Sequence, residues 1–293
     1  MHIRFLKNNA VLLLVVLFVF SCSTSKRTGK YTVLPGTWQS QPIVIDGDCT
    51  DWPSPYPNYD AKAMVAYATS NDADNLYITM QTGDPLTQVK ILKQGMTVSI
   101  DTGGRKDPSY NINYPLPNET DLSELFTQGE GVKKDGSTHL SRQFEQKLRK
   151  NAESASQFAI DGFGTCSGGY MVAQTLPCGI KVKISVDEYK QLVWEAVVPF
   201  KALYNRDQIG APYAGKAISV CFAVKGFKSQ SKGTDNNASP MGANNMGGGG
   251  MGAGGRPNST PMGASVNSPA KDNPMQRLYE STRTWKHFAI AWQ

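Results

Sequence analysis

Apolar and polar residues alternate along several short stretches of this chain, and such alternation predicts β-strands. It is clearest in residues 76–81, where Leu76, Ile78 and Met80 share one face. Residues 217–224 are apolar on both faces, which is typical of a central strand. Further stretches of this kind are residues 64–69, 96–101, 170–176, 180–186, 191–198 and 284–292.

Turn residues divide these strands into pairs. A cluster of Asp, Asn and Ser at residues 70–75 joins the strands before and after it into one antiparallel hairpin, and a short polar gap at residues 187–190 joins a second pair. Many short strands with turn signals between them predict an all-β chain. We expect an antiparallel β-sandwich, with a closed barrel as the alternative.

Two stretches interrupt the strand pattern. Residues 107–164 are polar and proline-rich at first; within them, residues 140–155 place Phe144 and Leu148 four apart among good helix formers, which predicts one inserted amphipathic helix. Residues 229–274 consist mostly of Gly, Asn, Ser, Pro and Met. This composition cannot bury enough apolar surface to offset the entropy of ordering, so we expect a long disordered loop there.

The N-terminus has the pattern of an export signal. Arg4 and Lys7 precede an apolar stretch at residues 10–20, which is too short to span a bilayer but suits a signal peptide. Ser21 and Cys22 follow directly, and this arrangement resembles a bacterial lipoprotein signal. The resemblance implies cleavage before Cys22 and acylation of its thiol, for example with palmitate, which anchors the chain to a membrane. An ordinary secretory signal with an incidental cysteine is the alternative.

These patterns divide the chain into a signal peptide at residues 1–21, a tether at residues 22–38 and a single β-sandwich at residues 39–293. The tether is short, polar and basic. It lacks the acidic cluster that follows the lipidated cysteine in many surface-exposed lipoproteins of the Bacteroidetes. That comparison implies an outer-membrane lipoprotein of the cell envelope that faces the periplasm.

The charge distribution argues against nucleic-acid binding. The net charge is +6, but Lys and Arg are spread along the chain, whereas nucleic-acid binding needs them clustered.

The export signal implies an oxidising compartment, in which disulfides can form. Cys166 and Cys178 flank the predicted strand at residues 170–176, so we expect a bond between them, with Cys49 and Cys221 buried or paired. Histidine is scarce and no Cys-x-x-Cys pair occurs, so no zinc site is predicted.

Four local motifs resemble the family 9 carbohydrate-binding modules and their DOMON-like relatives. They are Ile-Val-Ile-Asp-Gly-Asp-Cys-Thr-Asp-Trp at residues 43–52, the hairpin at residues 66–77, Gly-Met-Thr-Val-Ser-Ile-Asp at residues 95–101, and Trp-Glu-Ala-Val-Val-Pro-Phe-Lys-Ala-Leu at residues 194–203. The resemblance implies an antiparallel β-sandwich that clamps a sugar between aromatic rings. Stacking of this kind is physically general, because the C–H faces of a sugar pack on aromatic faces.

The aromatic residues supply the candidate binding site. Trp285 begins the last predicted strand and is the first choice, with Tyr110 or Tyr114 opposite it. Tyr56 is a further candidate, because Tyr56, Tyr59, Tyr110 and Tyr114 all occur in proline-rich loops. Trp52 and Trp194 are expected in the core, the first because it belongs to the family motif and the second because it lies in an alternating strand.

No catalytic set is evident. Only His139 and His287 remain beyond the leader, and no pair of carboxylates marks a glycosidase cleft. Two alternatives remain open: a calcium ion held by Asp46, Asp48, Asp72 and Asp74, and, as in some DOMON relatives, haem held by His287 with Met96 or Met171. The prediction is a lipid-anchored envelope protein, non-catalytic and without a cofactor, whose partners are the membrane and a glycan. The alternative is a structural lipoprotein that binds other envelope proteins without a sugar site.

Overall fold

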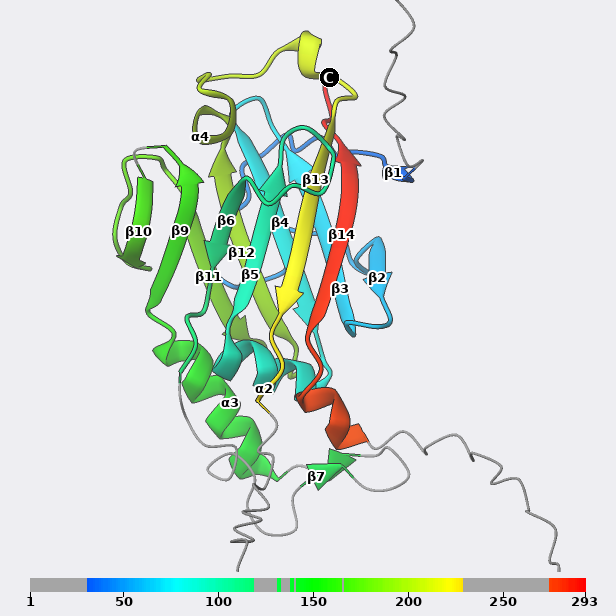
Figure 1. The fold of residues 1–293 in the computed structure, drawn as a ribbon, viewed down its shortest axis with the longest axis vertical. Helices are drawn as coiled ribbons and strands as arrows, with labels where there is room; N and C mark the ends of the chain where they lie inside the picture. Colours follow the sequence, from blue (N-terminus) through cyan, green and yellow to red (C-terminus); the bar gives the residue numbers. More distant parts are fainter. Residues whose placement is uncertain (1–30, 119–130, 133–137, 140, 165, 229–273) are drawn as a thin grey trace, which may run out of the picture. The chain divides into compact units, whose positions relative to one another are not determined.

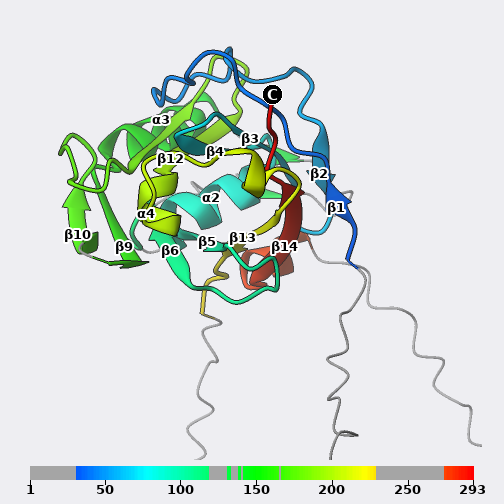
Figure 2. The ribbon, with the colours of Figure 1, turned by 90° about the horizontal axis from the view of Figure 1, so that it is seen from above.

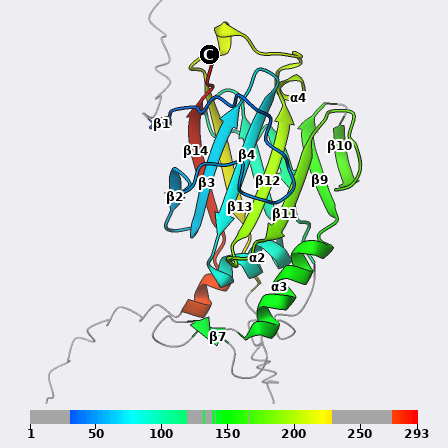
Figure 3. The same ribbon diagram turned by 180° about the vertical axis from the view of Figure 1, so that it is seen from behind.

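Two β-sheets lie face to face (Figure 1, and from behind in Figure 3). The computed structural model describes residues 31–118, 131–132, 138–139, 141–164, 166–228 and 274–293. The front sheet has the order β1 (Val33–Leu34), β14 (Thr282–Ala289), β13 (Ala217–Val224), β5 (Met96–Asp101), β6 (Tyr110–Asn113), β9 (Gln157–Phe163), β10 (Cys166–Met171). The back sheet has the order β11 (Lys181–Val186), β12 (Leu192–Pro199), β4 (Asn75–Thr82), β3 (Val65–Asn71), β2 (Asn58–Asp60).

Neighbouring strands are antiparallel, apart from β1, which runs parallel to β14. Side chains from the inner faces of both sheets fill the space between them. Tyr67 of β3, for example, contacts Phe222 of β13 with ring centroids 5.5 Å apart. Trp194 of β12 is fully buried, and its indole Nε1 donates to the carbonyl oxygen of Tyr114 at 2.9 Å. The predicted all-β sandwich is therefore confirmed, as are both predicted hairpins, β3–β4 and β11–β12.

The segment at residues 107–164 differs from the prediction, because it supplies β6 and β9, which lie between β5 and β10 in the front sheet. The sequence did not reveal β6, because its two outward-facing residues are Asn111 and Asn113. Asparagine is a poor strand former. Their side-chain oxygens accept hydrogen bonds from Ser99 and Thr97 on the neighbouring β5, at 2.7 and 2.6 Å. These cross-strand contacts hold the strand despite its weak intrinsic preference.

The strand after Cys166 is also shifted. The sequence predicts it at residues 170–176, whereas β10 spans Cys166–Met171 and pairs with β9. The run Ser167-Gly168-Gly169 conceals the strand, because glycine weakens strand propensity. The pairing also contains a register shift between Cys166 and Gly168, which is consistent with a β-bulge at this point.

Two helices lie together beyond one end of the strands (Figure 1). The predicted helix is confirmed as α3 (Arg142–Ser154), which begins where the Ser141 side chain accepts a hydrogen bond from the Phe144 amide. The other, α2 (Pro85–Gln94), was not predicted. Its residues are buried on most sides, including Lys90 and Lys93, so it lacks the polar face by which a surface helix is recognised. Seen along the strands, α2 lies between the two layers (Figure 2).

The remaining short elements are α4 (Phe200–Tyr204), the 3₁₀ turns η2 (Ala211–Tyr213) and η3 (Pro274–Leu278), and the strand pair β7 (Gly131–Val132) and β8 (Thr138–His139). The sandwich begins inside the segment assigned as a tether, because β1 pairs with β14 and the Trp38 ring packs edge-on against Trp292. The leader, Cys22 and residues 229–273 of the Gly-rich stretch lie outside the described residues.

A disulfide joins Cys166 and Cys178, as predicted. It ties the start of β10 to the residues that lead into β11, and so connects an edge of the front sheet to an edge of the back sheet. Cys221 is buried and Cys49 is partly buried, and neither forms a disulfide. Within the described residues, no helix is long and apolar enough to cross a membrane.

Candidate functional site

The outer face of the back sheet is divided into a covered half and an open half. Residues 43–56 cross one half and form a second, small hydrophobic core with it. This core contains Ile43, Trp52, Ala68, Tyr77 and Val197. The other half of the face carries no such cover and is the starting point for a binding site.

Glu195 holds the covering segment in place. Its carboxylate is buried and accepts hydrogen bonds from the Trp52 indole Nε1 at 2.6 Å and from the Gly47 amide at 2.7 Å. Burial raises the pKa of the Glu195 carboxyl to about 7, although both N–H donors act in the opposite direction. Gly47 has a φ of +88°, and a Cβ there would lie 2.9 Å from the Ser185 Cβ, so only glycine fits this turn.

The open half carries an exposed aromatic ring. Strand register places Tyr59 of β2 beside Ala66 of β3, and Ala66 beside Gln81 of β4. Tyr59 is 58% exposed, and the small Ala66 leaves a hollow between its ring and Gln81. We call this hollow the open groove, with a volume of about 400 Å³. Its lining is Tyr59, Met64, Ala66, Gln81, Thr82, Gly83, Asp84, Pro85 and Gln191.

Two glutamine amides face this groove. Gln81 and Gln191 are both partly buried, and within the described part of the chain neither side chain makes a hydrogen bond to another protein group. The Gln191 amide lies against Gly83, where a Cβ would be only 2.6 Å from its Nε2, so a larger residue at position 83 would displace the Gln191 side chain. Each amide offers donors and an acceptor at the groove surface. The groove therefore combines a flat apolar ring with polar groups that suit hydroxyls.

Backbone strain occurs at the groove wall. Met64 has a φ of +56°, a left-handed conformation that non-glycine residues rarely adopt. Its sulfur accepts a hydrogen bond from the Tyr59 hydroxyl at 3.4 Å. Strained residues often occur at binding sites, where the surrounding structure compensates for their cost. Here the strained residue positions the exposed ring.

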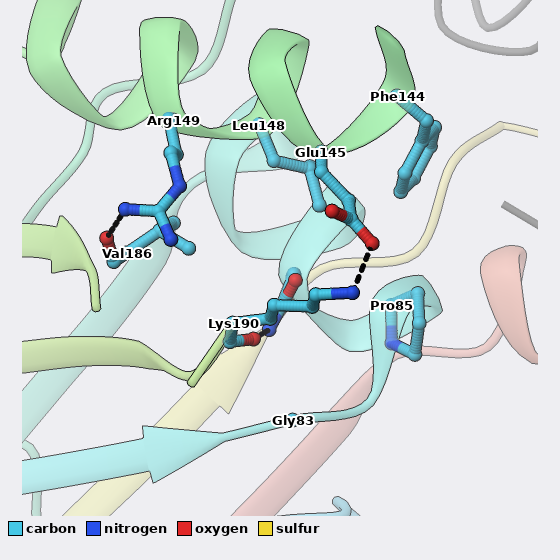
Figure 4. Close-up of a pocket in the computed structure, with 9 residues that line it drawn as sticks. Gly83, Pro85, Phe144, Glu145, Leu148, Arg149, Val186 and Lys190 are labelled. Atoms are coloured by element: carbon cyan, nitrogen blue, oxygen red, sulfur yellow. Dashed lines mark hydrogen bonds and ion pairs between the residues drawn. The ribbon is translucent and has the colours of Figure 1, made fainter. Parts of the chain in front are cut away.

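A second cavity adjoins the open groove. It lies between α3, the link from β4 to α2, and the turn between β11 and β12 (Figure 4), and its volume is about 320 Å³. We call it the helix cavity, and its lining is Gly83, Pro85, Gln88, Phe144, Glu145, Leu148, Arg149, Val186 and Lys190. Gly83 and Pro85 line both spaces, so the two form neighbouring compartments at the end of the back sheet where β4 leads into α2.

The residues that the sequence selected are not brought together. Trp285 lies on β14 next to Cys221, partly buried on the outer face of the front sheet. Tyr110 and Tyr114 face the opposite way, into the core, where they contact Phe163 and Phe158. The structure therefore does not show Trp285 and these tyrosines as two sides of one clamp.

The tyrosine hydroxyls explain these positions. Tyr114 is 1% exposed and donates to the carbonyl oxygen of Ala155 at 2.9 Å, and Tyr110 donates to that of Leu203 at 2.7 Å. Tyr56 is partly buried beside the second core, with its hydroxyl 3.0 Å from that of Thr79. Of the loop tyrosines, Tyr59 is the one with a freely presented ring. Its partners Gln81 and Gln191 were missed, because only strand register reveals that they share a groove.

The proposed metal and haem ligands have other roles. Asp46 and Asp72 accept backbone hydrogen bonds within their own turns, from Asp48 and Asp74 respectively, at 2.8 Å each. Met171 lies on β10, five strands from His287 on β14, which corresponds to about 24 Å at the usual strand spacing. Met96 faces the inner core, whereas His287 faces outward. Within the described residues, no cluster of His, Cys, Asp and Glu is arranged to hold a metal ion.

One Ser-His-Asp row does occur, although the sequence showed none. Register aligns Asp101, Ser219 and His287 across three strands, and the Ser219 hydroxyl lies 2.7 Å from His287 Nδ1. Ser219 is completely buried, so a substrate cannot reach its oxygen. The Asp101 carboxylate accepts hydrogen bonds from the backbone amides of Gly103, Arg105, Lys106 and Asp107. Asp101 therefore fixes the loop after β5, and the buried Ser219 hydroxyl is not accessible to a substrate.

Comparison with known proteins gives weak likenesses. No protein-family model matches the chain, and no curated protein sequence matches it. A family 9 carbohydrate-binding module from Caldicellulosiruptor kristjanssonii, solved with glucose, is 11% identical, with a TM-score of 0.31 over 66% of this chain and 78% of that one. The same family from that organism, solved with cellotriose, gives 11% identity and a TM-score of 0.31 over 66% and 76%. Likenesses of this size do not indicate what the present chain binds.

Proposed function

We propose that this chain is a lipid-anchored, non-catalytic glycan-binding protein of the cell envelope, and that the open groove is its sugar site. The observation that carries the proposal is the exposed Tyr59 ring beside two amides, Gln81 and Gln191, that bind no other protein group within the described residues. A pyranose stacked on the ring places its hydroxyls toward these amides. The groove volume of about 400 Å³ lies within the range of ligand sites.

The lipid anchor and the outer-membrane location rest on the sequence around Cys22. A periplasm-facing position suits a protein that holds a glycan close to the membrane. The groove is shallow and has one stacking ring, so we expect affinities between micromolar and millimolar, or about −4 to −8 kcal/mol.

The experiment is a glycan array with the full-length protein in detergent, followed by titration of the best oligosaccharide. Tyr59→Ala removes the stacking surface and should weaken binding at least about fivefold, since such contacts contribute about 1 kcal/mol or more. Tyr279→Ala is the matched control, because Tyr279 is 45% exposed and does not line the groove. Equal binding by the wild type and Tyr59→Ala would rule out the open groove as the sugar site.

The same titration tests the first choice from the sequence. If Trp285→Ala abolishes binding while Tyr59→Ala does not, the sugar lies on the outer face of the front sheet. If no glycan binds the wild-type protein, the alternative function gains support, namely an envelope lipoprotein that binds other proteins. Neither variant should unfold the chain, since Tyr59 is exposed and Trp285 is only partly buried.

A further inference from the structure

The helix cavity differs from the open groove in its charge. Two of its three charged side chains, Arg149 and Lys190, are positive, and Glu145 is negative, which leaves a net charge of +1. The Arg149 guanidinium donates to the carbonyl oxygens of Val186 and Asp187, so no carboxylate offsets its charge within the described residues. The floor is apolar, with Phe144 and Leu148 both buried.

Lys190 is presented at the mouth of this cavity by an unusual backbone. Its φ is +64°, a conformation in a tight turn that normally selects glycine or asparagine. The turn is fixed by a hydrogen bond from the Lys190 amide to the Asp187 carbonyl oxygen at 3.1 Å. The Gln88 side chain of α2 also donates to the Lys190 carbonyl oxygen at 2.7 Å. Lysine at this position costs stability that glycine would save, which points to a role for its ammonium group.

The ammonium group is available to a ligand. Lys190 Nζ lies 2.6 Å from Glu145 Oε1, across the cavity mouth (Figure 4), and the two side chains are 64% and 30% exposed. An ion pair that is this exposed contributes little to stability, so an incoming anion can displace it. Even with the pair intact, an ammonium group has two further N–H donors.

We propose that the helix cavity is the subsite for a carboxylated sugar, a hexuronate residue of the glycan whose neighbouring residue stacks on Tyr59. This inference rests on the proposed function and adds the chemical class of the ligand. Gly83 and Pro85 line both compartments, so one oligosaccharide can occupy both. The carboxylate of the uronate binds Lys190 at the mouth of the cavity. A charge-assisted hydrogen bond of this kind is stronger than one between neutral groups.

The test uses pairs of oligosaccharides that differ only in charge. Oligogalacturonides are compared with their methyl esters, and hyaluronan oligosaccharides with their carboxyl-reduced forms, by titration of the full-length protein. The acidic member of at least one pair should bind about tenfold more tightly, which corresponds to about 1.4 kcal/mol. The ratio of the two affinities should fall as the salt concentration is raised, because salt screens the charge of the carboxylate.

Three variants locate the effect. Lys190→Asn removes the charge while asparagine tolerates the left-handed backbone, so the fold is kept and the acidic preference should be lost. Lys150→Asn is the matched control, because Lys150 is on the same helix as Glu145 but outside the cavity. This variant should keep the preference for the acidic oligosaccharide. Glu145→Gln removes the competing carboxylate and should strengthen binding of the acidic member.

The outcomes separate the two proposals. If neutral oligosaccharides bind through Tyr59 with no preference for their acidic partners, the uronate subsite is refuted and glycan binding stands. If the acidic preference persists in Lys190→Asn, the carboxylate binds elsewhere and the helix cavity is not the subsite. If no member of any pair binds and the array is also empty, both proposals fail.

Discussion

The Trp52 indole Nε1 lies 2.6 Å from Glu195 Oε1, and this hydrogen bond helps to tie residues 43–56 to β12 of the back sheet. The two residues are 143 positions apart in the chain. The second carboxylate oxygen of Glu195 accepts a hydrogen bond from the Gly47 amide. The Asp46-Gly47 turn and the tryptophan of the same motif are therefore both bound by one carboxylate. The motif is thus explained by packing: it covers half of the outer face and leaves the other half open.

Glu195 should make stability depend on pH. Its folded-state pKa is raised by burial to about 7, above the ordinary value of 4.5. The stability that protonation supplies is therefore fully present below about pH 4.5 and lost as pH rises through about 7, a change on the order of 3 kcal/mol. Denaturant unfolding of the wild type at pH 5, 6, 7 and 8 measures this change.

The control for that prediction is Glu195→Gln, which cannot titrate. It should be destabilised at every pH, because its NH₂ group faces an N–H donor where the acid offers an oxygen. Its unfolding free energy should nevertheless be flatter between pH 5 and 8 than that of the wild type. Parallel pH profiles for the two proteins would assign the dependence to another group.

Trp52→Phe should test the hydrogen bond separately from the packing. Phenylalanine keeps much of the apolar contact with the second core but loses the N–H donor, so the buried carboxyl oxygen lacks a partner. We expect a loss of about 1–3 kcal/mol in unfolding free energy. The loss should be larger at pH 8, where Glu195 is ionised, than at pH 5. An equal loss at both values would mean that packing alone accounts for it.

The Cys166–Cys178 disulfide should stabilise the fold by about 2–3 kcal/mol, because it closes a short loop and limits the unfolded chain. The double variant Cys166→Ser with Cys178→Ser should show this as a lower thermal midpoint. Cys49→Ser is the control, since Cys49 is not disulfide-bonded. A reducing agent should lower the midpoint of the wild type and leave the double variant unchanged.

The Gly-rich stretch should be replaceable by a short linker. The residues at its two ends already meet, since the Phe227 amide donates to the Leu278 carbonyl oxygen at 2.8 Å. Joining residue 229 to residue 273 through a few glycines and serines therefore requires no change in the sandwich, and loop-closure entropy varies only slowly with length. Differential scanning calorimetry should give a nearly unchanged midpoint, whereas a large drop would show that the stretch contributes to packing.

Lipidation of Cys22 is a prediction from the sequence. Cys22→Ala should release the protein from the membrane fraction or leave its leader uncleaved, since the thiol is the acyl acceptor. Mass spectrometry of the mature protein and fractionation of cells measure both effects. An unchanged membrane fraction together with an unchanged processed mass would rule the lipid anchor out. Protease treatment of intact cells then tests whether the protein faces the periplasm.

The sequence by itself determined the strands that alternate, the helix containing Phe144 and Leu148, and the disulfide. These features are local, because side chains two or four positions apart share a face whatever the rest of the chain does. It did not reveal α2 or β6. A helix buried on most sides has no polar face, and a strand with Asn111 and Asn113 has low strand propensity, so both depend on contacts from elsewhere in the fold.

The candidate site was decided by tertiary structure. Tyr110 and Tyr114 looked like loop residues, but Tyr110 begins β6, Tyr114 directly follows it, and both rings face the core, while Tyr59 stays exposed. Gln81 and Gln191 join Tyr59 only because β2, β3 and β4 pair in one register and because Gln191 approaches Gly83 closely. A one-residue slip would send these side chains to the other face. Local alternation determines which residues form a face, but strand pairing determines which faces meet.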